Sequence, residues 1–246
     1  MLEAMRAPTA AATLASARAL HVGYPHLLQG LRGEALRELL DTGGEAIRAA
    51  NGGVPPLLSV DVNGATLGAA GDADGVLGPA LPLVDVLHAN FEEACHLSGG
   101  DDETLDEATA TDEQLHALAA PLLERGVAVV AITLGPSGAY VALTSDRERL
   151  VARGATLRAA TVGWEAGAWA RLPAPPVGVE INANGAGDAF TAGILAAMLW
   201  RPADANAEPP CLEEALRVGL ASARQRVDAT APRQTVAELV CGHPGP

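Results

Sequence analysis

The chain has 246 residues, 49% of them hydrophobic and 3% aromatic, so it can bury a sizeable core built mainly from Ala, Leu and Val. Its formal net charge of −14 argues against nucleic acid and against an anionic membrane surface as partners, because both attract clustered cations. All 16 basic residues are arginine. The absence of lysine excludes Schiff-base chemistry and the P-loop, because both need a lysine amine.

The cysteines and the apolar segments help to predict the cellular compartment of the protein. Cys95, Cys211 and Cys241 lie far apart, which favours a reducing compartment over a disulfide framework or a zinc site. The longest apolar run ends at Trp200 and is too short to cross a bilayer. Residues 1–18 are Ala-rich, without the continuous apolar segment of a secretory signal, and are expected to be a poorly ordered leader. We therefore expect a cytoplasmic protein, with an organelle such as a plastid or mitochondrion as the lesser alternative.

Strand-like and helix-like segments alternate along the chain. Short apolar runs predict strands, and apolar residues at helical spacing predict helices. The expected strands are 18–25, 56–63, the second half of 79–90 and 127–135, with hairpin or edge strands at 138–144 and 147–160. The expected helices are 27–51, the segment from 91, 114–126, 188–200 and 211–227, with 237–246 as a tail. This alternation predicts an α/β fold with a mostly parallel central sheet and helices on both faces.

Ligands of such folds collect at the carboxyl ends of the strands. Residues at or just beyond predicted strand ends are Asp61, Asn63, Asn90, Thr133, Gly135 and Asp188. Asp61 and Asn63 are candidates to face the substrate or its phosphate, although an Asp-x-Asn pattern suits a closed turn equally well. Their shared position indicates a binding site more strongly than any single motif does.

The segment Gly185-Ala186-Gly187-Asp188 stands where a long apolar helix begins. Its two glycines let the backbone approach a ligand, and a helix start presents unpaired N–H groups. Such groups suit an anion hole for a transferring phosphoryl group, and Asp188 suits a base that takes the proton of an attacking hydroxyl. On this motif alone, Asp188 could equally be a simple helix cap.

Two further segments also leave alternatives open. Asn90 and Glu93 have the spacing of a capping box, and the same pair suits an outer-shell site for Mg²⁺, which often keeps its waters. Thr133, Gly135 and Gly138 follow a buried strand and could hold the phosphates of a nucleotide by close backbone approach. A type II turn would explain these glycines as well.

With these segments in this order, the chain resembles the ribokinase-like, phosphofructokinase-B-type family of carbohydrate and nucleoside kinases. The resemblance is carried by VDVLHANFEEACHLSG, VVAITLGPSGAYV and above all NANGAGDAFTAGIL. It runs from about Ala19 to about Val236. It implies a three-layer α/β kinase domain over 19–236, with ATP and Mg²⁺ as cofactors and a small sugar or nucleoside as partner.

The same resemblance implies roles at the start of the long apolar helix. Asp188 would be the base that deprotonates the acceptor hydroxyl. Gly185, Ala186 and Gly187 would form the anion hole for the transferring γ-phosphoryl group.

It also implies roles at the two neighbouring strand ends. Asn90 and Glu93 match an N-x-x-E element associated with Mg²⁺ and phosphate. Thr133, Gly135 and Gly138 match the segment that holds ATP. The helix around 221–226 stands where members of the family close off the adenine pocket.

The sequence departs from the family's pattern in two places. Asn182-Ala183 stands where members usually have Asp-Thr, so dependence on a monovalent cation does not follow from the resemblance. The family's N-terminal part, with a Gly-Gly substrate motif, an acidic sugar-binding residue and a small β-sheet lid, is not identifiable. The chain is therefore expected to begin in the middle of the fold, and the identity of the acceptor is not predicted.

Two functions remain as hypotheses of different classes. The first is an ATP-dependent phosphotransferase that phosphorylates a hydroxyl of a sugar or nucleoside. The alternative is a truncated or degenerate, non-catalytic member of the family that binds nucleotide or a partner. A Rossmann dehydrogenase is disfavoured because no GxGxxG follows the first strand. Nucleic-acid and membrane partners are not expected, and a homodimer stays open.

Overall fold

The computed structural model describes residues 10–28, 30–62, 75–99, 105–152, 154–179, 182–201 and 209–241. At its centre is a six-stranded sheet with the strands in chain order. The strands are β1 (Ala19–Gly23), β2 (Leu57–Asp61), β3 (Val86–Asn90), β4 (Val129–Thr133), β5 (Ala139–Leu143) and β6 (Trp169–Leu172). The first four are parallel, and β5 and β6 each pair antiparallel with the strand before them. The predicted α/β fold with a mostly parallel sheet is confirmed.

The central strands are buried on both faces, which explains their near-continuous apolar sequences. In β4, Val130 and Ile132 pack into one hydrophobic cluster. Val129 and Ala131 alternate with them and pack into a second cluster on the opposite face. All four side chains have at most 1% of their surface exposed. The sheet therefore separates two cores.

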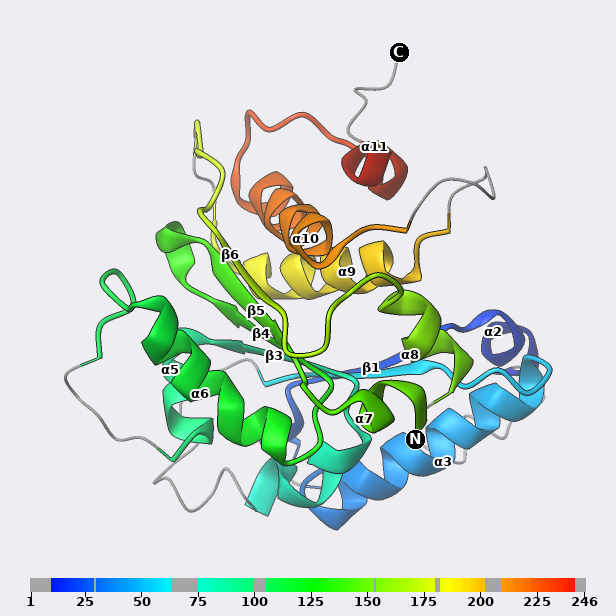
Figure 1. Cartoon of the computed structure of the whole chain (residues 1–246). Helices are drawn as coiled ribbons and strands as arrows, with labels where there is room; N and C mark the ends of the chain where they lie inside the picture. The colour runs from blue at the N-terminus through cyan, green and yellow to red at the C-terminus, as the bar shows by residue number, and fades with distance from the viewer. Residues whose placement is uncertain are drawn as a thin grey trace.

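Helices cover both faces of the sheet (Figure 1). One face carries α3 (Glu34–Ala50), α5 (Phe91–Leu97) and α6 (Asp112–Glu124). The other carries α9 (Ala186–Leu199) and α10 (Leu212–Val227), with the short α11 (Val236–Cys241) beyond them. The described part of the chain also includes the 3₁₀ segments η2 (Pro25–Leu27), η3 (Gly78–Leu83) and η4 (Gly135–Ser137).

Helices α9 and α10 pack closely because glycine stands at their contact. A Cβ atom on Gly193 of α9 would lie 2.9 Å from the Cα of Gly219 on α10. A Cβ on Gly219 would in turn lie 2.9 Å from a side-chain carbon of Ile194. This packing fixes α9 over the sheet, so the position of its first turn is determined by the core.

The prediction of strands over 147–160 is wrong. This segment forms α7 (Arg147–Ala152) and α8 (Ala155–Ala160). Asp146 starts α7, because its Oδ1 accepts the backbone N–H groups of Glu148 at 2.8 Å and Arg149 at 3.1 Å. An acidic cap that satisfies unpaired amides at a helix start outweighs the short alternating pattern that suggested a strand.

Other boundaries also differ from the predictions. The helix expected over 27–51 begins only at Glu34, after η2 and a turn. Helix α2 (Ala11–Ser16) lies inside the segment 1–18 that was expected to be poorly ordered, and α11 extends into the expected tail. Within the described residues, no helix is both long and apolar enough to cross a membrane.

Candidate active site

The first turn of α9 stands at the carboxyl ends of the parallel strands. Gly185 precedes the helix with a φ of 80°, a left-handed conformation that favours glycine. The amides of Ala186 and Ala189 donate to the carbonyls of Ala183 and Gly185, both at 3.0 Å. Within the described part of the chain, the amides between them, at Gly187 and Asp188, have no backbone acceptor. These two N–H groups are therefore available to an anion.

The exposed carboxylate of Asp188 is contacted by Tyr24, which is remote from it in sequence. The Tyr24 hydroxyl lies 3.0 Å from Oδ1 and 2.9 Å from Oδ2 of Asp188 and donates to that carboxylate. Tyr24 follows β1 with a φ of 60°, the only positive φ among the described non-glycine residues. Burial and then the hydrogen bond to Asp188 raise the pKa of Tyr24, so its proton stays on the phenol. Asp188 is thus oriented by a hydroxyl donor.

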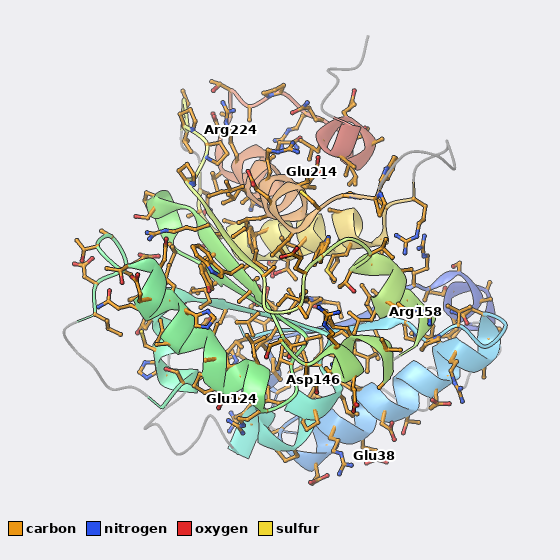
Figure 2. The ribbon with its side chains drawn as sticks, in the orientation of Figure 1. Glu38, Glu124, Asp146, Arg158, Glu214 and Arg224 are labelled. Atoms are coloured by element: carbon orange, nitrogen blue, oxygen red, sulfur yellow. The ribbon has the colours of Figure 1, made fainter. Side chains whose placement is uncertain are left out.

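A cavity of about 690 Å³ opens beside this turn. Its walls come from the ends of β3 and β4, the segment 174–177, the first turns of α9 and the end of α10. The predicted site residues that line it are Asn90, Thr133, Gly135, Gly138, Ala186 and Gly187. Arg224, labelled on α10 in Figure 2, brings a positive charge to its wall. The structure thus brings the strand-end motifs together around one cavity, large enough for a small ligand.

The loop after β4 needs glycine for structural reasons as well. Gly138 has a φ of 106°, and a Cβ there would lie 2.0 Å from the carbonyl oxygen of Leu172 in β6. Gly135 has a φ of 46°, and its Cβ would lie 3.2 Å from Oε1 of Glu107. Burial, and then the charge of Asp106, raise the pKa of Glu107, which also lines the cavity. The glycines let the backbone turn tightly at the cavity wall, and they keep the wall open.

Asn90 and Glu93 form a capping box at the start of α5. The Asn90 side chain accepts from the Glu93 amide, and the Glu93 carboxylate accepts from the Asn90 amide, both at 2.8 Å. Glu93 is 1% exposed, whereas Asn90 and Glu92 line the cavity. The capping box engages both side chains, and among the described residues no group of three or more acidic, histidine or cysteine side chains is arranged to hold a metal ion.

Asp61 does not face the cavity, which differs from its expected place near the substrate. It is fully buried at the end of β2. Its Oδ1 lies 3.0 Å from His88 Nδ1, and its Oδ2 accepts from the Thr191 hydroxyl at 3.1 Å. Burial opposes its ionisation, but His88 and the hydrogen bonds outweigh burial and hold the pKa of Asp61 below its usual value. Asn63, the second predicted substrate residue, lies outside the described residues.

Sequence reasoning missed three residues of this region. Tyr24, just after β1, and His88, in β3, are remote in sequence from Asp188, so no local pattern indicates them. Arg226 of α10 lies against the loop before α9, where a Cβ on Gly185 would lie 3.2 Å from its Nε. The absence of lysine could have indicated an arginine such as Arg226 near the site, because the positive charge beside an anion must then come from arginine or a metal.

Comparison with known proteins identifies the family of this chain. A family model of pfkB family carbohydrate kinases matches residues 3–237, so the chain belongs to that family. A search of curated proteins finds no match.

Solved structures show the same ribokinase-like fold. The ribokinase of Arabidopsis thaliana, complexed with ribose and ATP, is 17% identical with a TM-score of 0.59, over 95% of this chain and 59% of that one. A PfkB protein of Polaromonas sp. JS666 is 23% identical with a TM-score of 0.56, over 94% and 60%. The aminoimidazole riboside kinase of Salmonella enterica is 21% identical with a TM-score of 0.53, over 90% and 60%. The chain therefore spans about 60% of the length of these matched structures.

Proposed function

We propose that this chain is an ATP-dependent phosphotransferase that phosphorylates a hydroxyl of a sugar or nucleoside. One observation carries the proposal. In the first turn of α9 the exposed Asp188 carboxylate already accepts a hydroxyl hydrogen bond, and it stands beside the free amides that border the 690 Å³ cavity. A base, an anion site and a nucleotide-sized cavity thus meet at one point. Family membership and the ribose and ATP bound by the Arabidopsis thaliana ribokinase support the same reading.

The residues have complementary roles in the proposed reaction. ATP occupies the cavity, with its phosphates against Thr133 and the glycine turn at Gly135 and Gly138. Its γ-phosphoryl group lies at the anion hole at the start of α9, where the free N–H groups of Gly187 and Asp188, and not the occupied one of Ala186, stabilise the developing charge. Asp188 takes the proton of the acceptor hydroxyl, whose oxygen forms the new bond to phosphorus as the bond to ADP breaks.

Mg²⁺ has a supporting place in this proposal. When bound, it neutralises charge on the phosphates of the nucleotide. Asn90 and Glu93 would hold it through water, because the capping box already uses their side chains. A protein described as a putative Ribokinase II from E. coli, 20% identical to this chain, has been solved in complex with ATP and Mg²⁺.

Tyr24 and an acceptor can share the base. A carboxylate offers about four lone-pair positions, and a single phenolic proton occupies only one of them. The acceptor hydroxyl therefore binds Asp188 beside the Tyr24 hydroxyl, on the side that faces the anion hole.

The experiment is an assay of phosphoryl transfer from radiolabelled ATP to a panel of sugars and nucleosides. We expect transfer by the wild type to at least one acceptor, and a loss of about 10²–10⁴-fold in Asp188→Asn, the usual range for a general base. The matched control is Glu213→Gln, which removes an exposed first-turn carboxylate from α10 instead of α9. Full turnover in Asp188→Asn would refute the base assignment.

A second function is nucleotide binding without transfer. The observation that favours it is length, because the chain spans about 60% of the matched structures. Calorimetry distinguishes the two functions. Saturable binding of ATP to the wild type, together with no transfer to any acceptor of the panel, would support the binding protein over the enzyme.

A further inference from the structure

A row of buried polar side chains runs beneath the proposed anion hole. It starts at Thr191 in α9, passes through Asp61 at the end of β2 and His88 in β3, and ends at the half-buried Thr133, the last residue of β4. The Thr191 hydroxyl donates to Asp61 at 3.1 Å, and His88 Nδ1 lies 3.0 Å from the same carboxylate. His88 Nε2 lies 3.2 Å from the Thr133 hydroxyl. The row thus joins the base-bearing helix to the cavity wall.

Burial makes this row unusual. Asp61 is fully buried, Thr191 is 1% exposed and His88 is 3% exposed. Removing an ionised carboxylate from water costs several kcal/mol unless partners compensate, and apolar residues of similar volume would often serve stability as well. Stabilisation of the fold therefore does not by itself explain these three buried polar side chains. Their position beneath the start of α9 indicates a different role.

The imidazole of His88 is also in contact with the anion hole itself. A Cβ atom on Gly187 would lie 3.1 Å from its Cε1. Its ring packs against Phe190, one turn further along α9, with the ring centroids 5.3 Å apart. Both Gly187 and Phe190 line the cavity. The imidazole is thus wedged between the sheet and the first turn of α9.

Each end of the row touches a different part of the proposed machinery. Thr191 stands three residues after Asp188, on the same side of α9. Thr133 lines the nucleotide cavity. A displacement of His88 would therefore move the helix start and the cavity wall relative to each other.

We propose that His88, held by Asp61, is a positioning residue that sets the Gly187–Asp188 turn at the distance from Thr133 that a terminal phosphate requires. Asp61 is the anchor of this unit, and Thr191 ties it to α9. This inference rests on the proposed function, since it assigns the turn to the phosphates of a nucleotide. It assigns Asp61 a role beneath the phosphate site in place of contact with the acceptor.

The test compares His88→Asn with wild type. Asparagine keeps a donor near the position of Nδ1 for Asp61, but it is too short to reach Thr133 or to fill the space under Gly187. The matched control is His116→Asn, which removes an imidazole of α6 that is hydrogen-bonded to Tyr140 of β5 and does not line the cavity. Thr191→Val is a second, nearly isosteric variant that cuts the link to α9.

Two measurements distinguish a positioning role of His88 from a role in the stability of the fold. Calorimetric titration with adenosine, AMP, ADP and ATP is expected to show a loss that grows with the number of phosphates. For His88→Asn we expect about tenfold weaker ATP binding and AMP binding within about twofold of wild type. Hydrogen exchange at Ala186 and Ala189, whose amides hold the turn, is expected to be about tenfold faster.

The outcomes are distinguishable. Unchanged ATP affinity and unchanged exchange in folded His88→Asn would overturn the inference, as would an equal loss for all four ligands. If His88→Asn does not fold, Thr191→Val decides by the same criteria. A wild type that binds no nucleotide would refute the proposed function, and the exchange comparison would then still decide whether His88 holds the turn.

Discussion

At the scale of single residues, the Tyr24–Asp188 pair shows how a strained residue can serve a site. Tyr24 holds a left-handed backbone conformation, which costs a non-glycine residue of order 1 kcal/mol. Its hydroxyl donates to the proposed base from 164 residues away in sequence. The fold maintains the strain, and the carboxylate gains a fixed orientation.

The prediction for this pair uses Tyr24→Phe. The variant keeps the ring but loses the donor, so the Asp188 carboxylate can rotate away from the acceptor. We expect kcat to fall about fivefold with the KM for ATP unchanged. This loss is smaller than the full contribution of a hydrogen bond to a charged group, because the variant only frees the carboxylate to rotate. Tyr140→Phe, at the only other tyrosine of the chain, is the control for steady-state kinetics. An unchanged kcat in Tyr24→Phe would show that the contact has no role in turnover.

Residue-scale prediction from sequence succeeded where a motif is local. The helix start at Gly185–Asp188 was foreseen because small residues and an acid precede an apolar run. The roles of Tyr24 and His88 could not be foreseen, because each depends on which strand ends become neighbours. Asp61 was placed correctly at a strand end, but its burial depends on His88 and Thr191, which no spacing reveals.

At the scale of elements, α7 is attached to the sheet by a buried ion pair. Arg149 Nη2 lies 3.0 Å from Asp85 Oδ1 and donates to the carbonyl of Val84 at 2.8 Å. Asp85 is 1% exposed and also accepts from the Leu58 amide at 2.9 Å. The pair links α7, β2 and the start of β3.

Removal of one partner should be costly because the other charge stays buried. For Arg149→Met we expect the free energy of unfolding, measured in urea, to fall by about 3 kcal/mol. Arg147→Met, at an exposed position of the same helix, should change it by less than about 0.5 kcal/mol. Equal and small effects of the two substitutions would mean that the pair contributes little.

A second element-scale feature is the loop 177–179, which borders the cavity and is held by Asp228 after α10. The Asp228 carboxylate accepts the amides of Gly178 at 2.9 Å and Val179 at 3.1 Å, and the Thr230 hydroxyl at 2.6 Å. These bonds, that from Gly178 first, hold the pKa of Asp228 far below its usual value. Because the folded pKa is depressed, the stabilisation is complete above pH about 4 and is lost as the pH falls further.

Urea unfolding of Asp228→Asn at several pH values tests this reasoning. Asparagine cannot carry the charge, so the variant should be less stable than wild type at pH 7. The difference should shrink as the pH is lowered below about 4, because the Asp228 carboxylate of the unfolded wild type then binds a proton while that of the folded protein stays ionised. Asp41→Asn, at an exposed position of α3, is the control and should show no such trend. A difference for Asp228→Asn that stays constant with pH would contradict the assignment.

The elements that sequence patterns predicted best are those with a buried, apolar face. β4 is apolar from Val129 to Ile132, β2 and β3 are mostly apolar, and α10 has an amphipathic repeat. The error over 147–160 arose because short helices with half-exposed faces give weak periodicity, and their start depends on the Asp146 cap. β6 was not predicted, because its residues are only partly buried and it is held by pairing with β5.

At the scale of the whole molecule, alternating segments and strand-end residues were enough to predict the layered fold and the edge of the sheet that carries the site. The cavity itself was not predictable, because its walls come from six separate parts of the chain. The acceptor was not predictable either. The chain spans about 60% of its matched structures, and the residues it presents near Asp188 do not specify one sugar or nucleoside.

The proposed reaction requires that the cavity bind ATP with its terminal phosphate at the start of α9. A crystal structure of the wild type with a non-hydrolysable ATP analogue and Mg²⁺ would show where the nucleotide lies. We predict the adenine beside α10 and the γ-phosphate within hydrogen-bond distance of the Gly187 and Asp188 amides. A nucleotide bound elsewhere, or one in the cavity with its phosphates directed away from α9, would contradict the account.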